Sequence, residues 1–198
     1  MGIFKLSDDV VFNLPTDFEA IENISDEGEV MHYIKSEKSY DDEGNAKHKL
    51  SVNLSVNDFE DSQTISDLID EKEAIANEEF SNINIVYSRP NGNSDVVIYS
   101  LAYSPTVLLG LKITVVITTG LVKINSQKYL QVVSMHSFNG ITEDTQEKFS
   151  YTLKVLNTLK INGNQLKISV AEQKKIIKQL SNCICNESDS TTEHVMIR

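Results

Sequence analysis

Residues 47–56 read Lys-His-Lys-Leu-Ser-Val-Asn-Leu-Ser-Val, and this stretch decides the fold class. From Leu50 to Val56 every second side chain is apolar, and the side chains between them are Ser or Asn. Successive side chains of a strand point to opposite faces, so this alternation predicts a strand with one buried and one hydrated face. The uninterrupted apolar runs typical of parallel sheets are scarce in the chain, so we expect an antiparallel sheet.

A second alternating stretch runs over residues 111–117, with its apolar side chains at odd positions. Beyond it the apolar residues Val122 and Ile124 are at even positions. A shift of one residue exchanges the two faces of a strand, so this change predicts a bulge or turn at Thr119-Gly120. Shorter strands are expected at residues 10–14, 30–36, 83–87, 96–103 and 128–136.

Polar clusters separate several of these strands and predict hairpin connections at residues 41–45, 90–93 and 125–127. The first cluster, Asp-Asp-Glu-Gly-Asn, is distantly similar to a calcium-binding loop. It lacks the alternating oxygen ligands and the late bidentate Glu of an EF-hand. We therefore expect a hydrated hairpin tip there and no metal site.

Three amphipathic segments predict helices. The first covers about residues 64–80, and the second covers about residues 142–160 and is ended by Asn162-Gly163. The third begins at Ser169-Val170-Ala171-Glu172, which is a capping box. The residues that we expect in the core are Leu50, Val52, Leu54, Ile113, Val115, Ile117, Leu153 and Leu156.

The order of these elements predicts one α+β domain over residues 1–168, in which an antiparallel sheet is covered by the two main helices. Three strands precede the first helix, and four strands lie between the two helices. Residues 169–185 would add a short amphipathic C-terminal helix, and residues 186–198 would form a flexible tail. A length of 198 residues with 3 Pro and 8 Gly fits one domain of this kind.

Two segments carry a family resemblance. Residues 11–18 read Val-Phe-Asn-Leu-Pro-Thr-Asp-Phe, and residues 149–161 read Phe-Ser-Tyr-Thr-Leu-Lys-Val-Leu-Asn-Thr-Leu-Lys-Ile. With the element order, they make residues 8–161 resemble the PsbP-like domain superfamily, including its bacterial DcrB-like relatives. The resemblance implies an antiparallel sheet covered by helices and a role in binding or assembly in place of catalysis. The chain departs from the family pattern by lacking Trp near Phe18 and a signal peptide, and by adding a helix after Ile168.

Charge is distributed unevenly along the chain, whose formal net charge is -11. Residues 1–80 contain 21 acidic and 6 basic side chains, whereas residues 81–198 contain 8 acidic and 12 basic ones. Contacts with phosphates need clustered Lys and Arg, so the acidic region argues against nucleic acid as a partner. Two interpretations stay open: the acidic residues only keep the protein in solution, or they steer a basic protein partner.

The acidic side chains of the first helix are the candidate partner-binding residues, and they are expected on its outer side: Glu71, Glu73, Glu78 and Glu79. The third helix is basic instead, with Lys174, Lys175 and Lys178 beside apolar residues. Such a helix can pack on its own chain, including the acidic half, or dock on a partner or an anionic membrane. We favour packing within the chain, with the acidic half of the chain facing this helix.

The sequence contains no motif for catalysis or cofactor binding. It has no Gly-x-Ser-x-Gly elbow, Gly-x-Gly-x-x-Gly loop or Walker loop, so we expect no catalytic triad and no cofactor. The four His residues share no metal-ligand spacing, and the three that fall in predicted strands, His32, His48 and His136, are expected to pack in the core or across strands. Cys183 and Cys185 are too few for a tetrahedral metal site and are expected to be reduced thiols.

Targeting signals are also missing from the sequence. Residues 1–18 include three acidic side chains and no apolar run of signal-peptide length. The longest apolar run, residues 107–117, is shorter than the ~20 residues of a membrane span. We therefore expect a cytoplasmic, non-enzymatic binding or adaptor protein with an acidic interaction surface. The alternatives are a secretion-associated or immunity-type protein that binds a basic client, and a small hydrolase with a dispersed site near His48 or His136.

Overall fold

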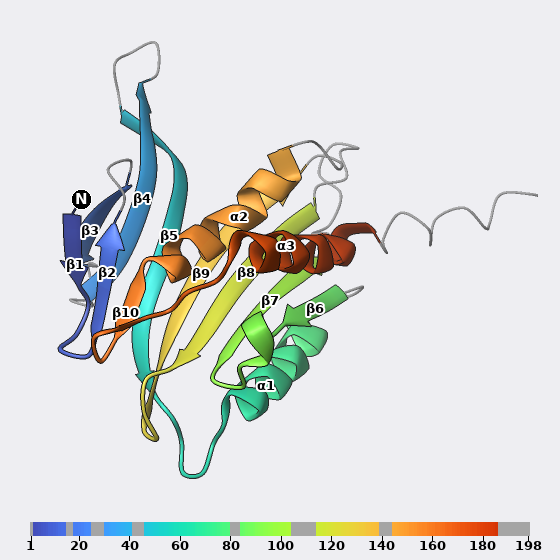
Figure 1. Cartoon of the computed structure of the whole chain (residues 1–198). Helices are drawn as coiled ribbons and strands as arrows, with labels where there is room; N and C mark the ends of the chain where they lie inside the picture. The colour runs from blue at the N-terminus through green and yellow to red at the C-terminus, as the bar shows by residue number, and fades with distance from the viewer. Residues whose placement is uncertain are drawn as a thin grey trace, which may run out of the picture.

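The structure, a computed structural model, describes residues 2–14, 18–24, 30–40, 46–79, 84–103, 114–138 and 144–185. Within these ranges the chain forms two antiparallel sheets and three α-helices (Figure 1). The α+β class with antiparallel pairing is therefore confirmed, but the strands form two sheets where one was predicted. The expected tail, residues 186–198, and the expected hairpin tip, residues 41–45, lie outside the described residues.

The larger sheet has seven strands in the order β3-β4-β5-β9-β8-β7-β6. In chain order they are β3 (Phe18–Ile24), β4 (Val30–Tyr40), β5 (Ala46–Asp58), β6 (Asn84–Ser88), β7 (Val96–Tyr103), β8 (Thr114–Lys123) and β9 (Lys128–Phe138). The predicted hairpin between β8 and β9 is confirmed. At its turn, the side-chain oxygen of Asn125 accepts hydrogen bonds from the backbone N–H groups of Gln127 (2.8 Å) and Lys128 (2.9 Å).

The smaller sheet joins the first two strands of the chain to two short strands that lie between α2 and α3. Its strands are β1 (Gly2–Lys5), β2 (Val10–Leu14), β10 (Leu159–Ile161) and β11 (Asn164–Gln165). Strand β2 is central, because it pairs with β1 on one side and with β10 on the other. Asn162 and Gly163, with φ of 49° and 78°, turn β10 into β11. The predicted helix over residues 142–160 is thus wrong at its end, and Asn162-Gly163 is a hairpin turn, not a helix cap.

Strand β8 runs straight through Thr119-Gly120, so the predicted bulge or turn is wrong. Its pairing with β7 keeps one register from Val96 opposite Val122 to Tyr103 opposite Val115. Both faces of β8 are covered, and adjacent residues such as Leu121 and Val122 are buried on opposite sides. When both faces of a strand are buried, apolar residues can change from odd to even positions without a bulge or turn in the strand.

The helices are α1 (Ile65–Glu79), α2 (Asp144–Asn157) and α3 (Val170–Cys185), and a 3-10 turn spans Pro90–Gly92. Helices α2 and α3 lie across one face of the large sheet (Figure 1) and share a core with Val96 and Ile98 of β7. Helix α1 packs with Val97 and Tyr99 of the same strand. Because alternate residues of a strand point to opposite faces, α1 covers the other face, so the helices are divided between both faces.

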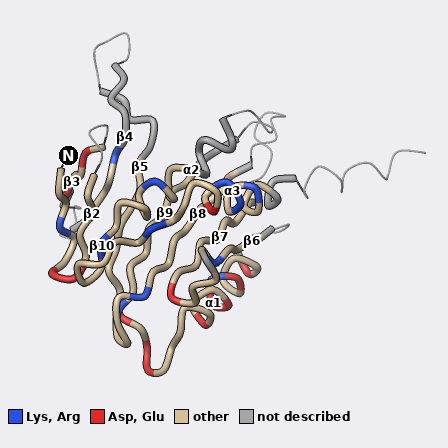
Figure 2. The backbone as a smooth tube through the Cα atoms, viewed as in Figure 1, with Lys and Arg blue, Asp and Glu red and all other residues tan. Residues whose placement is uncertain are grey.

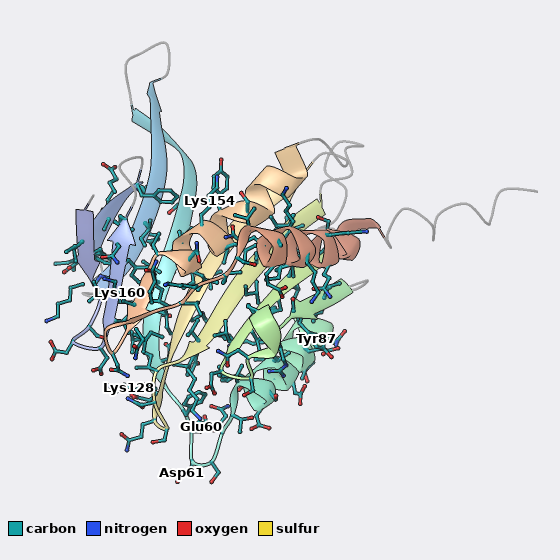
Figure 3. The ribbon with its side chains drawn as sticks, viewed as in Figure 1. Glu60, Asp61, Tyr87, Lys128, Lys154 and Lys160 are labelled. Carbon is teal, nitrogen blue, oxygen red and sulfur yellow. The ribbon has the colours of Figure 1, made fainter. Side chains whose placement is uncertain are left out.

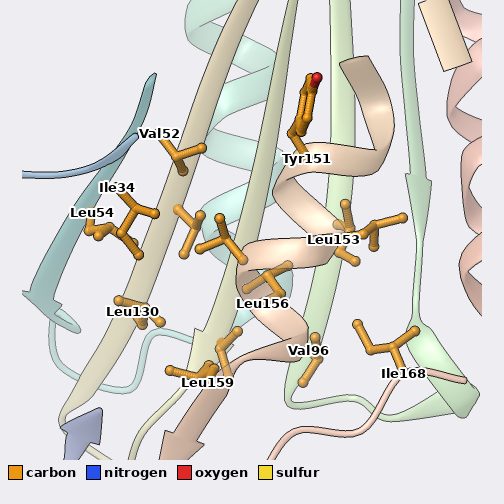
Figure 4. Close-up of a cluster of buried hydrophobic side chains, with 14 of the residues drawn as sticks. Ile34, Val52, Leu54, Val96, Leu130, Tyr151, Leu153, Leu156, Leu159 and Ile168 are labelled. Atoms are coloured by element: carbon orange, nitrogen blue, oxygen red, sulfur yellow. The ribbon is translucent and has the colours of Figure 1, made fainter. Parts of the chain in front are cut away.

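The main core lies between the large sheet, the small sheet, α2 and α3 (Figure 4). The predicted core residues that are buried are Val52, Leu54, Val115, Leu153 and Leu156. Ile117 is only partly buried, so its prediction is wrong, while Ile113 and the Leu50 side chain lie outside the described part of the molecule. Ser134 Oγ and Thr152 Oγ1, 2.6 Å apart, satisfy each other inside this core between β9 and α2.

Helix α3 packs within the chain, as favoured from its sequence. Its start is capped by Ser169 Oγ, which accepts a hydrogen bond from the Glu172 N–H at 3.2 Å. Ile176 and Leu180 are fully buried, and Ser88 Oγ on β6 donates a hydrogen bond to Gln179 Oε1 at 2.9 Å. The helix rests on β6, β7 and α2, on the opposite side of the sheet from the acidic helix α1, so the prediction that it faces the acidic half is wrong for α1.

Candidate functional site

Helix α1 begins at a capping box that fixes its first turn. The Thr64 N–H donates to Asp67 Oδ2 at 2.7 Å, the Thr64 hydroxyl donates to the same oxygen at 2.6 Å, and the Asp67 N–H donates to Thr64 Oγ1 at 3.3 Å. The side-chain and backbone hydrogen bonds from Thr64 hold the pKa of Asp67 below its ordinary value of 3.8. The helix that carries the candidate residues is therefore anchored at its N-terminus.

The acidic surface consists of the eight acidic side chains of residues 58–78, a segment in which Lys72 is the single basic residue. They follow α1 and the loop before it (Figure 2), and Glu60 and Asp61 lie at that loop (Figure 3). Of the predicted partner-binding residues, Glu71, Glu73 and Glu78 are exposed, whereas the Glu79 side chain lies outside the described residues.

Helix geometry separates these candidates into two flanks. Residues three and four apart share a helix face, so Glu71 and Glu78 lie on the same face as Ile75, one turn before it and one turn after it. Glu73 is two residues from Ile75 and points to the other flank of the helix. The fold thus brings Glu71 and Glu78 together along one edge of α1 and does not bring Glu73 to that edge.

An open groove lies beside that edge, over strands β7, β8 and β9. It has a volume of about 260 Å³. Its apolar wall includes Ile75 of α1, Leu101 of β7, Ile117 of β8 and Val133 of β9. Ile75 is 40% exposed, and Met135, the next residue of β9 on the face of Val133, is 64% exposed. Apolar side chains are therefore accessible next to the acidic surface.

Two tyrosines connect the sheet to α1 near the groove. Burial raises the pKa of Tyr99, whose hydroxyl bonds Thr119, and burial also raises the pKa of Tyr129. The negative charge of the Glu71 carboxylate raises the pKa of Tyr129 further. Both phenols stay protonated at neutral pH, so they add uncharged polar groups to the sheet face that α1 covers.

A second cavity, of about 430 Å³, lies at the N-terminal end of α1. It is lined by side chains of both signs, with Arg89 and Lys123 as its cations and Asp95 as its carboxylate. Arg89 Nη2 donates a hydrogen bond to Ser66 Oγ on α1 at 3.1 Å, and Nη1 donates to the Ser94 carbonyl oxygen at 3.4 Å. Arg89 thus connects the first turn of α1 to the β6–β7 connection.

The histidines predicted to pack within the sheet are only partly described. The His32 ring lies 6.0 Å from the Phe4 ring, measured between centroids, and so packs between the two sheets. Its Nδ1 lies 4.0 Å from Glu22 Oε2. The side chains of His48, His136, Cys183 and Cys185 lie outside the described residues, and the hydrolase hypothesis stays a prediction.

Two further properties concern the described residues as a whole. Among them, no group of three or more His, Cys, Asp and Glu side chains is arranged to hold a metal ion. None of the described helices combines the length and the apolar character that crossing a membrane requires.

Neither a family model nor a curated protein matches the chain. Among solved structures, the chain is similar to the solution structure of cyanobacterial PsbP (CyanoP) from Synechocystis sp. PCC 6803. The match covers 79% of this chain and 89% of that chain, with 13% sequence identity and a TM-score of 0.39. This is a weak, fold-level likeness. Membership of the PsbP-like and DcrB-like superfamily stays a prediction from residues 8–161, and no property is transferred from the neighbour.

Proposed function

We propose that this protein is a non-enzymatic binding or adaptor protein whose acidic surface binds a basic protein. The supporting observation is the division of α1 into a buried stripe and an exposed acidic face. Ile65, Leu68 and Ile69 are buried, whereas Asp70, Glu71, Glu73 and Glu78 are exposed. A surface with a concentrated charge of one sign attracts partners of the opposite sign and speeds their association.

The arrangement of these acids lowers the stability of the helix, which favours a role outside folding. Asp70 and Glu73 are three residues apart, so they form a like-charge pair that destabilises a helix. Glu78 lies near the C-terminal end, where the helix dipole disfavours carboxylates, and the last turn holds no basic residue. Acidic residues whose only role was to keep the protein in solution could lie at positions where they do not destabilise the helix.

The test compares two variants of the full chain that carry the same net charge. One neutralises the candidate residues, as E71Q/E73Q/E78Q/E79Q. The control neutralises four exposed acids elsewhere, as D8N/D9N/E22Q/D95N. Proteins retained from a cell extract would be identified, and association rates with each retained protein would be measured at low and high salt.

We expect retained proteins to be basic, and we expect the first variant to associate with them at least about tenfold more slowly at low salt. The control variant should associate like the wild type. Equal rates for both variants, or an association that does not depend on salt, would contradict the proposal.

A further inference from the structure

The groove beside α1 adds apolar contacts to a surface that is otherwise acidic. We infer that this groove receives the apolar side chains of a basic amphipathic helix of the partner, whose Lys and Arg residues contact Glu71 and Glu78. This inference rests on the proposed function and adds the chemistry of the binding segment.

The floor of the groove continues into an accessible apolar row across three neighbouring strands. Leu101 of β7 pairs with Ile117 of β8, and Ile117 pairs with Met135 of β9. Exposure increases along this row, from 7% at Leu101 through partly buried Ile117 to 64% at Met135. The row therefore extends from the covered part of the sheet into solvent, and an added apolar side chain would bury it.

The groove is large enough for such a side chain. An apolar cavity of about 150 Å³ accommodates a benzene ring, and the groove has a volume of about 260 Å³. Ile75 forms its wall on the helix side, and Val133 lies on its floor. The groove therefore has room for one branched or aromatic side chain of a partner, which would contact both residues.

The carboxylates beside the groove favour a partner segment that carries positive charge. Glu71 and Glu78 flank Ile75 on the same edge of α1, at spacings of four and three residues. Lys72 also lines the groove and is the one basic side chain in residues 58–79. A partner helix with apolar anchors three or four residues apart and Lys or Arg beside them matches this spacing. A second copy of this chain would instead bring its own acidic surface against the first, and the two would repel.

The experiment uses two synthetic peptides as probes of the full-length protein. The first is an amphipathic helix of Leu and Lys, and the second has the same Lys residues with every Leu replaced by Ser. The groove variant is I75S/M135S, and both of its positions are exposed enough for the fold to tolerate the change. The matched control is V170S, which removes a 69% exposed apolar side chain on the opposite face.

Dissociation constants would be measured by titration calorimetry at low salt. We expect the groove variant to bind the Leu-containing peptide about tenfold more weakly than the wild type. Its affinity for the Ser-containing peptide should stay within about twofold, because that binding is electrostatic. The V170S control should bind both peptides like the wild type, and the E71Q/E78Q variant should lose affinity for both.

Three results would overturn the inference. Unchanged affinity of I75S/M135S for the Leu-containing peptide would exclude the groove but leave the proposed function intact, provided that E71Q/E78Q binds more weakly. Self-association of the wild type that I75S/M135S abolishes would identify a second copy as the occupant. Nuclear Overhauser contacts between the Met135 methyl group and residues 104–113 in the free protein would identify the chain itself as the occupant. Unchanged binding by E71Q/E78Q would instead contradict the proposed function.

Discussion

Gly120 of β8 lies directly beneath Leu156 of α2. A Cβ atom placed on Gly120 would be 2.6 Å from Leu156 Cδ1, which is closer than real Cβ atoms approach other carbons. Leu156 is fully buried, so its side chain cannot move away without displacing its neighbours. Glycine at this position allows α2 to approach the strand closely, which is a recognised use of glycine inside a strand.

The substitution Gly120→Ala should therefore destabilise the protein by about 1 to 3 kcal/mol, because it overpacks the core. The free energy of unfolding would be measured by urea titration. Gly2→Ala is the matched control, since nothing lies within 4 Å of a Cβ at that position. Equal stability of G120A and G2A would contradict this prediction, because it would show that the Leu156 side chain can move to accommodate the added methyl group.

Leu153→Ala should lower the free energy of unfolding by about 2 to 5 kcal/mol, because Leu153 is fully buried and its truncation leaves a cavity. The control is the neighbouring exposed residue, Lys154→Ala. Lys154 Nζ lies 4.9 Å from the centroid of the Tyr151 ring, a contact of about 0.5 to 1 kcal/mol at an exposed site. An unchanged melting temperature for L153A would contradict the prediction, because it would mean that α2 does not turn Leu153 toward the core.

Neutralising the basic face of α3 should leave stability nearly unchanged. The triple variant K174Q/K175Q/K178Q removes exposed charges and should change the free energy of unfolding by no more than about 0.5 kcal/mol at low or high salt. Ile176→Ala should instead cost about 2 to 5 kcal/mol, since Ile176 is fully buried. Marked salt-dependent destabilisation of the triple variant would indicate that the lysines pair with the acidic half of the chain.

The lowered pKa of Asp67 predicts a specific pH dependence. A group whose pKa is lower in the folded state stabilises the fold above its unfolded pKa, ordinarily 3.8, and this contribution is lost as pH falls through the folded value. Urea midpoints of the wild type and Asp67→Asn would be compared between about pH 6 and about pH 2.5. The wild type should be the more stable at pH 6, and the difference should shrink below pH 3.8. A constant difference over this range would contradict the prediction.

Strong local patterns predicted much of the fold. The alternation of residues 50–56 correctly indicated β5, and the capping box at Ser169 correctly indicated the start of α3. Strands β1 and β3 were missed because they carry weak patterns: Ile3 of β1 is 75% exposed, and β3 is an edge strand of the large sheet. Leu159 was assigned to a helix because an apolar residue three positions after Leu156 fits a helix face, although it fits the buried side of β10 equally well.

The candidate site was predictable only on its helical side. The acidic residues of α1 could be assigned to the surface, because the apolar stripe of the helix determines which side faces the core. The groove could not be predicted, because it depends on how much of the sheet α1 leaves uncovered. Val133 and Met135 are two positions apart, which indicates that they share a face of their strand. Only the pairing of β9 with β8, however, places Met135 beside Ile117.

The pairing of Val10 with Ile161 in the small sheet has a consequence for protein synthesis. Chains are made at about 5 to 20 residues per second, so β2 is finished roughly 7 to 30 seconds before β10 exists. During that interval one edge of β2 has no strand to pair with, although Val10 and Phe12 are fully buried in the finished protein. A ribosome that stalls before residue 161 would therefore hold a nascent chain with an open apolar edge, which is the kind of surface that chaperones recognise.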